Sequence, residues 1–284
     1  GGMARGKGWY ARRERIMSVR IGYPRITARF VLLQKAQPRP QDEAMTEQLH
    51  AQQQEPQQEP QQEIEQPEDF TIQPETDALL VVDMQPDFMP GGPLAVAEGD
   101  QIVSPIAALM QRFSLVVATQ DWHPAQHISF ASQHGRSPFD AIPLYGSTQT
   151  LWPDHCIAGT SGAALHPGIP QDRIGILVRK GTYRDIDSYS AFRENTGPDG
   201  QRRTTGLSAM LSARGVRRVF VCGLARDFCV GWSALDAQAE GLLAIVLDDL
   251  TRAVYPERRA EADALFAQGN VLHRPSSLLK GGAL

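Results

Sequence analysis

The chain has few cysteines, no long apolar run and no excess of positive charge in its globular part. Its 284 residues include only three cysteines, Cys156, Cys222 and Cys229, too few and too scattered for a disulfide framework. Free thiols suit a reducing compartment, so we expect a cytoplasmic protein. No run of eighteen apolar residues is present, so no membrane span and no membrane partner are predicted.

Charge is strongly segregated along the chain. Residues 1–40 carry a net charge of +9 and residues 41–75 carry −10, which leaves −3 for the remaining 209 residues. The globular part therefore offers no basic surface, and we expect no nucleic-acid partner.

The first 75 residues are expected to lie outside the fold. Residues 41–69 repeat Gln-Gln-Glu-Pro units and have almost no apolar side chains, so ordering them would bury too little surface. The basic leader is Arg-rich like an organelle-targeting peptide, but Pro24 interrupts it and no amphipathic pattern is evident. We interpret residues 1–75 as a disordered extension, with Met45 as an alternative start, and residues 76–284 as one domain.

From residue 76 onward, short β-branched runs alternate with stretches of helical apolar spacing. Strands are predicted at 78–83, 115–119, 174–180, 219–223, 243–247 and 270–273, and helices at 100–113, 206–213, 228–240 and 256–268. This alternation predicts an α/β fold, a single domain with a parallel five- to six-stranded sheet and helices on both faces. No Gly-x-Gly-x-x-Gly follows the first strand, which disfavours a dinucleotide-binding oxidoreductase.

One carboxylate and two imidazoles form a candidate metal site. Asp121 and His123 follow the second strand, and His155 lies in a later Pro-containing segment at 152–156. These ligands suit zinc, iron or manganese and leave room for water or substrate. An Asp-x-His pair alone is more often an ordinary loop feature than a metal site.

Polar side chains also follow other predicted strands. Asp83 and Lys180 come at the ends of the first and third strands, and Cys229 follows the fourth. Because ligands of open α/β sheets bind at the carboxyl ends of strands, we expect these groups to converge with Asp121. The set is typical of a metal-assisted cysteine hydrolase.

Cys229 is the candidate nucleophile. It falls in the first turn of a predicted helix with Asp227 as N-cap, where backbone N–H groups would lower a thiol pKa and could hold an oxyanion. A buried structural cysteine is the commoner alternative, and it is the interpretation kept for Cys222. Asp83 could take the thiol proton, although a strand-end cap would explain it equally well. Lys180 would favour both the thiolate and the carboxylate, and the apolar strand before it argues against a solvated surface lysine.

Five segments carry a resemblance to a known family: VVDMQPDFMPGGPLAV, TQDWHPAQHISFAS, LWPDHCIAGTSGAALHP, RKGTYRDIDSYSAF and VCGLARDFCV. They resemble the isochorismatase-like cysteine hydrolase family, and its nicotinamidase members in particular. The resemblance implies a catalytic triad of Asp83, Lys180 and Cys229. It also implies one divalent metal ion held by Asp121, His123 and His155, with His127 as a further candidate ligand.

The resemblance further implies details of substrate binding. A cis peptide is expected at Leu224–Ala225, with an oxyanion hole formed by the backbone N–H groups of Ala225 and Cys229. A pyridine ring would lie against Phe88 and Trp152, and the remaining expected pocket residues are Leu224 and Tyr189.

The implied reaction is hydrolysis of nicotinamide to nicotinate and ammonia through a cysteine thioester, as in NAD salvage. The metal would orient the pyridine ring, and pyrazinamide is a plausible second substrate.

Two alternatives remain open: a sibling hydrolase acting on another small amide, an N-carbamoyl compound or an enol ether, and an inactive metal-binding or scaffold homologue. A homo-oligomer is compatible with the sequence.

Overall fold

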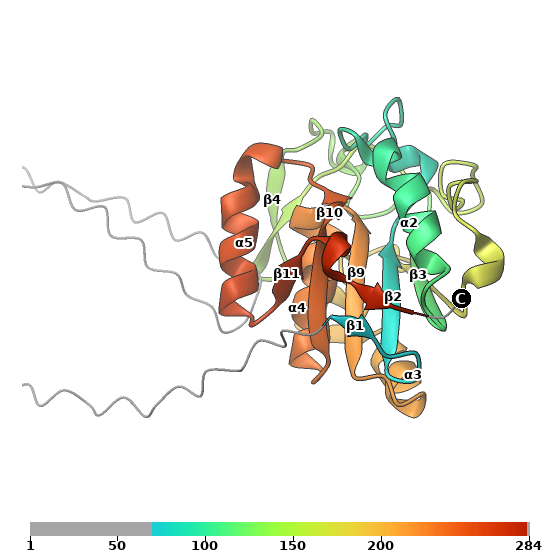
Figure 1. The fold of residues 1–284 in the computed structure, drawn as a ribbon. Helices are drawn as coiled ribbons and strands as arrows, with labels where there is room; N and C mark the ends of the chain where they lie inside the picture. The colour runs from blue at the N-terminus through green and yellow to red at the C-terminus, as the bar shows by residue number, and fades with distance from the viewer. Residues whose placement is uncertain (1–69, 283–284) are drawn as a thin grey trace, which may run out of the picture. The chain divides into compact units, whose positions relative to one another are not determined.

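The computed structural model describes residues 70–282 (Figure 1), and the expectation of disorder for residues 1–69 lies outside the described residues. Phe70 and Ile72 are buried, and strand β1 (Thr71–Ile72) pairs with β12 (Lys280–Gly281). Residues 70–75, which the sequence analysis assigns to the extension, are therefore part of the fold.

The centre of the fold is a six-stranded sheet in which every neighbouring pair is parallel, in the order β11-β10-β9-β2-β3-β6. This confirms the predicted α/β fold with its parallel sheet. The strands are β2 (Asp77–Val82), β3 (Leu115–Asp121), β6 (Ile176–Lys180), β9 (Arg218–Leu224), β10 (Leu243–Arg252) and β11 (Leu272–Arg274). Every residue of β2 is buried, as expected for a central strand covered on both faces.

Helices cover both faces of the sheet. They are α2 (Val103–Met110), α3 (Leu207–Ala213), α4 (Gly231–Ala239) and α5 (Arg259–Gln268). The chain runs outward from β2 to β3 and β6, crosses back to β9, and runs outward again to β10 and β11. Because such crossovers are right-handed, the two directions place α2 on one face and the later helices on the other. In Figure 1, α2 lies in front of the sheet and α4 behind it.

Short 3-10 helices connect these elements: η1 (Pro86–Phe88), η2 (Gly99–Ile102), η3 (Ala131–His134), η4 (Gln171–Arg173), η6 (Pro256–Arg258) and η7 (Ser276–Leu278). The sequence pattern missed two antiparallel hairpins, β4 (Ala141–Leu144) with β5 (Ser147–Thr150), and β7 (Arg193–Thr196) with β8 (Arg202–Thr204). Their strands are short and mostly polar or exposed, so they carry little apolar periodicity. Among residues 70–282, no helix is long and apolar enough to cross a bilayer.

The topology creates a crevice where the strand order reverses. Strands β2 and β9 are neighbours, but the connections that leave them run in opposite directions along the sheet. Ligands of open α/β sheets bind at such a switch point, outside the carboxyl ends of the strands. Asp83 directly follows β2, and the segment after β9 carries Cys229.

Candidate active site

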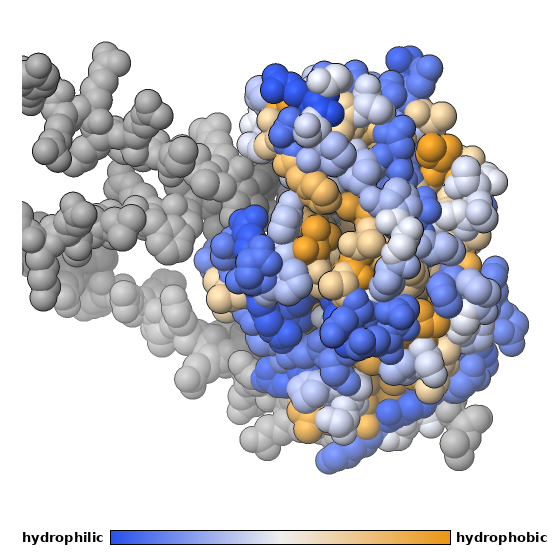
Figure 2. All heavy atoms as spheres, turned by 90° about the horizontal axis from the view of Figure 1, so that it is seen from above, coloured by the Kyte–Doolittle hydropathy of each residue, from blue (hydrophilic) through white to orange (hydrophobic). Residues whose placement is uncertain are grey.

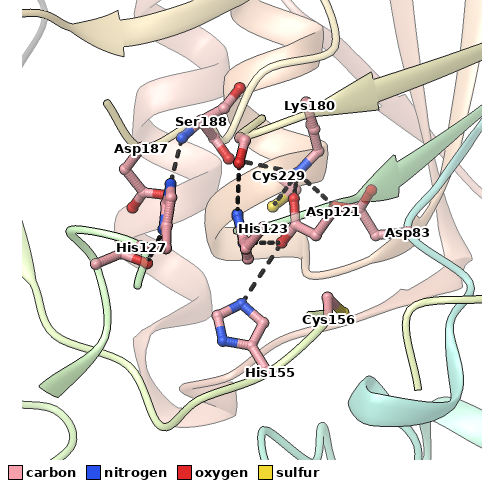
Figure 3. Close-up of polar contacts among 12 residues, drawn as sticks. Asp83, Asp121, His123, His127, His155, Cys156, Lys180, Asp187, Ser188 and Cys229 are labelled. Atoms are coloured by element: carbon pink, nitrogen blue, oxygen red, sulfur yellow. Dashed lines mark hydrogen bonds and ion pairs between the residues drawn. The ribbon is translucent and has the colours of Figure 1, made fainter. Parts of the chain in front are cut away.

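The candidate catalytic groups lie at the carboxyl ends of four neighbouring strands of the sheet, β2, β3, β6 and β9. Asp121 and Lys180 are the last residues of β3 and β6, and they are paired across these neighbouring strands. Asp83 follows β2 and adopts a left-handed backbone conformation with a φ of 48°, which turns the chain away from the sheet. Cys229 reaches the same edge from the segment after β9 (Figure 3).

Lys180 is the centre of the site. Its side chain is fully buried, and its Nζ lies 2.7 Å from Oδ2 of Asp83 and 3.3 Å from Sγ of Cys229. The same ammonium forms an ion pair with Oδ1 of Asp121 and donates a hydrogen bond to the carbonyl of Ser188 at 3.4 Å. The structure therefore brings the three predicted triad residues into mutual reach and adds Asp121 to them.

The two carboxylates differ in their electrostatic state. Burial raises the pKa of Asp83 above its ordinary value of 3.8, against the opposing effect of Lys180, and the charge of Asp121 adds to the increase. Burial also disfavours the charged form of Asp121, but Lys180 and His123 outweigh it and hold the pKa of Asp121 well below 3.8. The two carboxylates in turn raise the pKa of Lys180 well above 10.5 despite its burial. Lys180 is thus a permanent cation, and Asp83 is the more basic of the two carboxylates.

Cys229 lies in a π-helical turn, η5 (Arg226–Val230), which precedes α4. Burial raises the pKa of the thiol well above 9.0, Lys180 opposes this, and Asp83 and Asp121 add to the increase. The expectation that the start of a helix lowers the pKa of this thiol is therefore wrong, because burial beside two carboxylates dominates. The thiol keeps its proton at neutral pH until a base removes it, and a carboxylate oxygen of Asp83 lies within 4.8 Å of the sulfur.

Asp227 does not cap the helix as expected. Its carboxylate instead accepts hydrogen bonds from the backbone N–H groups of Val254 and Tyr255, at 2.9 and 2.8 Å. It ties the nucleophile turn to the chain after β10. The expected cis peptide between Leu224 and Ala225 is present directly before this turn.

The predicted metal ligands converge on Oδ2 of Asp121. The Nε2 atoms of His123 and His155 lie 3.5 and 3.6 Å from this oxygen (Figure 3). Nδ1 of His123 faces the carbonyl of Gly181 at 2.9 Å, and Nδ1 of His155 faces the carbonyl of Pro153 at 2.8 Å. A carbonyl can only accept a hydrogen bond, so each neutral imidazole has its proton on Nδ1 and its lone pair on Nε2.

This donor set fits a divalent cation. Two imidazole lone pairs and one carboxylate oxygen meet within 4.8 Å of one another, and all three side chains are buried. Backbone carbonyls fix both rings, as they commonly do for metal-bound histidines. Gly181 leaves the space that this arrangement requires, because a Cβ atom there would lie 2.5 Å from Nδ1 of His123.

His127 lies beside the ligand His123, but its two ring nitrogens contact other groups. Its Nδ1 lies 2.7 Å from the hydroxyl of Ser129 and its Nε2 lies 3.1 Å from the carbonyl of Ile186, so both ring nitrogens have partners. The ring stacks on His123 with a centroid distance of 4.1 Å. Burial and the neighbouring His123 lower the pKa of His127 to about 4, so it is neutral at pH 7. In this arrangement His127 packs against a ligand and does not offer a free nitrogen to the site.

A small aromatic pocket opens beside Cys229 and the metal ligands. Its lining includes four residues predicted from the sequence: Phe88, Trp152, Tyr189 and Ala225. It also includes five that were not predicted: Leu94, Val96, Asp187, Phe228 and Val254. Phe228 packs edge-on against Trp152 and Tyr189, at centroid distances of 4.9 and 5.4 Å. Seen from above, hydrophobic residues gather at the centre of the molecular face and hydrophilic residues border them (Figure 2).

Leu224 does not line this pocket. It is fully buried, and its side chain lies against Gly99. The position of Phe228, next to the nucleophile and on the same turn, is the one sequence signal that could have identified it as a pocket residue.

Comparison with known proteins agrees with this geometry. The family model described as the isochorismatase domain matches residues 77–272. The nicotinamidase of Acinetobacter baylyi is 48% identical over 178 residues, which cover 62% of this chain and 81% of that protein.

Solved structures of related proteins carry informative ligands. PnC1 from L. infantum in complex with nicotinate superposes with a TM-score of 0.66 at 40% identity, covering 75% of this chain and 98% of that one. The pyrazinamidase of Pyrococcus horikoshii in complex with zinc has a TM-score of 0.57 at 34% identity, covering 70% and 98% of the two chains. With the predicted triad assembled at the switch point of a matching fold, we conclude that the chain belongs to the isochorismatase family.

Proposed function

We propose that this protein is an amidohydrolase that converts nicotinamide to nicotinate and ammonia, as in NAD salvage. The observation that carries the proposal is the contact of one buried ammonium, Lys180, with a base, a thiol and a metal-ligand carboxylate. The names of the relatives, nicotinamidase and pyrazinamidase, agree with this chemistry.

Cys229 would be the nucleophile and Asp83 its base. The raised pKa of the thiol requires a base nearby, and a carboxylate oxygen of Asp83 lies within 4.8 Å of the sulfur. Asp83 takes the thiol proton, and the sulfur forms a bond to the carboxamide carbon. Lys180 remains charged throughout and stabilises the negative charge that passes between these groups.

The tetrahedral oxyanion would be held by the backbone N–H groups of Ala225, directly before the nucleophile turn, and of Cys229 within it. When the intermediate collapses, the carbon–nitrogen bond breaks and Asp83 gives its proton to the departing ammonia. A water molecule then adds to the thioester with Asp83 again as base, and nicotinate and the free thiol are released. In this second stage the carbon–sulfur bond breaks and Asp83 returns its proton to the sulfur. The acid proton of the product passes to ammonia, so that nicotinamide and one water give nicotinate and ammonium.

Asp121, His123 and His155 would hold one divalent ion, with zinc, iron and manganese as candidates. When bound, such an ion supplies a Lewis-acid position for the ring nitrogen of the substrate, which would fix the carboxamide relative to Cys229. A flat ring would lie against aromatic side chains of the pocket, namely Phe88, Trp152, Tyr189 and Phe228. A pyrazine ring has the same shape, so pyrazinamide is expected to enter the same pocket.

The test is ammonia and nicotinate release from nicotinamide by the purified protein, before and after chelator treatment. Release that is lost with chelator and restored by zinc, iron or manganese would support the reaction and the metal site together. Release that survives thorough metal removal would keep the cysteine chemistry but reject the role given to Asp121, His123 and His155. No release from nicotinamide or pyrazinamide would reject the proposal in favour of a sibling hydrolase or an inactive homologue.

A further inference from the structure

The side-chain amide of Gln85 is fully buried and is engaged in three hydrogen bonds. Its Oε1 accepts the backbone N–H of Asp121 at 2.8 Å. Its Nε2 donates to the carbonyl of Asp121 at 2.9 Å and to the carbonyl of Ala163 at 2.8 Å. Both backbone groups of the candidate metal ligand therefore depend on one side chain that follows Asp83 by two residues.

The amide of Gln85 makes the hydrogen bonds to the backbone of Asp121 that a neighbouring strand would otherwise make. The pairing of β2 with β3 ends at Val81 and Ala118, because the chain turns away from the sheet at Asp83. On the other side, β3 stays paired with β6 as far as Asp121 and Lys180. Without Gln85, the N–H and C=O of Asp121 that face away from β6 would be left unpaired in a buried site, which is costly.

The backbone position of Asp121 matters because its carboxylate has two tasks. Oδ1 pairs with Lys180, and Oδ2 faces the Nε2 atoms of His123 and His155. A small displacement of the Asp121 backbone would move Oδ2 away from the point where the three metal donors converge. We propose that Gln85 is a positioning residue that fixes Asp121 for metal binding, an inference that rests on the metal site of the proposed function.

Gln120 provides a matched control. It is also buried, and its Nε2 donates to the same carbonyl of Ala163, at 2.9 Å. Its Oε1 accepts a hydrogen bond from Arg179 at 3.5 Å, so its amide holds a different part of the chain from the backbone groups of Asp121. Replacing either glutamine by glutamate removes a buried hydrogen bond to Ala163, but only the change at Gln85 also removes the donor that holds the carbonyl of Asp121.

The experiment compares Gln85→Glu with Gln120→Glu in the full chain. Zinc affinity of the metal-free proteins is measured by competition with a chromogenic chelator, and the melting temperature is recorded in parallel. We expect Gln85→Glu to weaken zinc binding about 10- to 100-fold, the usual effect of removing a residue that supports a metal ligand. Gln120→Glu should lower the melting temperature but leave zinc affinity close to that of the unmodified protein.

Gln85→Asn is the second variant, in case the buried glutamate prevents folding. It keeps a neutral amide but is too short by one methylene to reach both backbone groups, so it should also weaken zinc binding. Unchanged zinc affinity in a folded Gln85 variant would overturn the inference, and so would an equal loss in Gln120→Glu. Failure of the unmodified protein to bind zinc, iron or manganese would instead reject the metal site of the proposed function.

Discussion

The Nζ atom of Lys180 lies 3.3 Å from the sulfur of Cys229, and the lysine side chain has no exposed surface. The contact places a fixed positive charge beside the atom that must become an anion. Because Asp83 and Asp121 share the same ammonium, the charge of Lys180 is also needed for the fold around the site.

Replacing Lys180 by methionine should therefore impair both stability and activity. The change leaves two buried carboxylates without a counter-charge, so we expect a loss of about 3–5 kcal/mol in the free energy of unfolding. Urea unfolding of the variant measures this loss. Arg179→Met is the control, because Arg179 is the preceding residue of β6 but stacks on Trp122 near the surface. Equal stability of the two variants would contradict the assigned role of Lys180.

Replacing Cys229 by alanine should abolish turnover of nicotinamide, by at least about a thousandfold, because Cys229 is the thiol whose sulfur lies 3.3 Å from Nζ of Lys180. Zinc affinity should be retained, since Cys229 is not one of the three proposed ligands. Cys222→Ala is the matched control: this thiol is buried within β9 and hydrogen-bonds to the carbonyl of Leu80. Turnover that survives in Cys229→Ala would reject the nucleophile assignment.

The pH profile of kcat/KM should show the raised pKa of Asp83. Burial places this pKa above 3.8, so as the pH falls Asp83 gains its proton, and loses its function as base, earlier than an ordinary aspartate would. The acid limb of the profile should therefore lie at higher pH than the ordinary aspartate value.

Thr119→Val gives a direct check of that limb. The hydroxyl of Thr119 donates to Oδ1 of Asp83 at 2.5 Å and stabilises the charged carboxylate. Without it the pKa of Asp83 should rise further, and the acid limb should move to higher pH. A limb that stays in place would show that another group controls the profile.

Gly181→Ala should weaken metal binding through His123. The φ of Gly181 is 63°, a conformation that strains alanine, and the added Cβ would lie 2.3 Å from Cε1 of the His123 ring. Gly200→Ala is the control, because Gly200 has a φ of 74° but open space around its Cα. Both variants should lose stability from the strained backbone, and chelator competition should reveal a loss of zinc affinity only in Gly181→Ala.

Phe228→Ala should raise the KM for nicotinamide about tenfold, since an aromatic wall of the pocket would be lost. Phe139→Ala serves for comparison, because Phe139 also touches Trp152, at a centroid distance of 6.0 Å, but is half exposed and outside the pocket. A similar KM in both variants would remove Phe228 from the binding site.

Much of the fold could be predicted because short apolar runs indicate buried strands, and polar residues mark where these strands end. The parallel sheet and the positions of Asp83, Asp121 and Lys180 follow from short buried strands that each end in a polar residue. Such a pattern says little about hairpins of polar residues, so β4 and β5 were not foreseen. Nor does it extend to Thr71 and Ile72, whose strand pairs with the far end of the chain.

The remaining features depend on contacts between segments distant in sequence. Asp227 has the chemistry of a helix cap, but its partners, Val254 and Tyr255, lie beyond the next strand. The thiol pKa of Cys229 was expected to fall because a helix start is a local feature, whereas burial and two carboxylates from other strands act in the opposite direction. Leu224 and Phe228 are neighbours of the nucleophile, and only the side-chain directions decide which of them faces the pocket.

The fold should tolerate circular permutation, because its first and last described strands, Thr71–Ile72 and Lys280–Gly281, are paired. Because these two-residue strands lie side by side and are parallel, a flexible segment that runs back along the pair could join residue 282 to residue 70. The exposed turn at 198–200, between β7 and β8, could then be cut to give new ends. A circularly permuted chain of this kind should keep the sheet order and all the contacts around Lys180, since none of them depends on where the polypeptide starts.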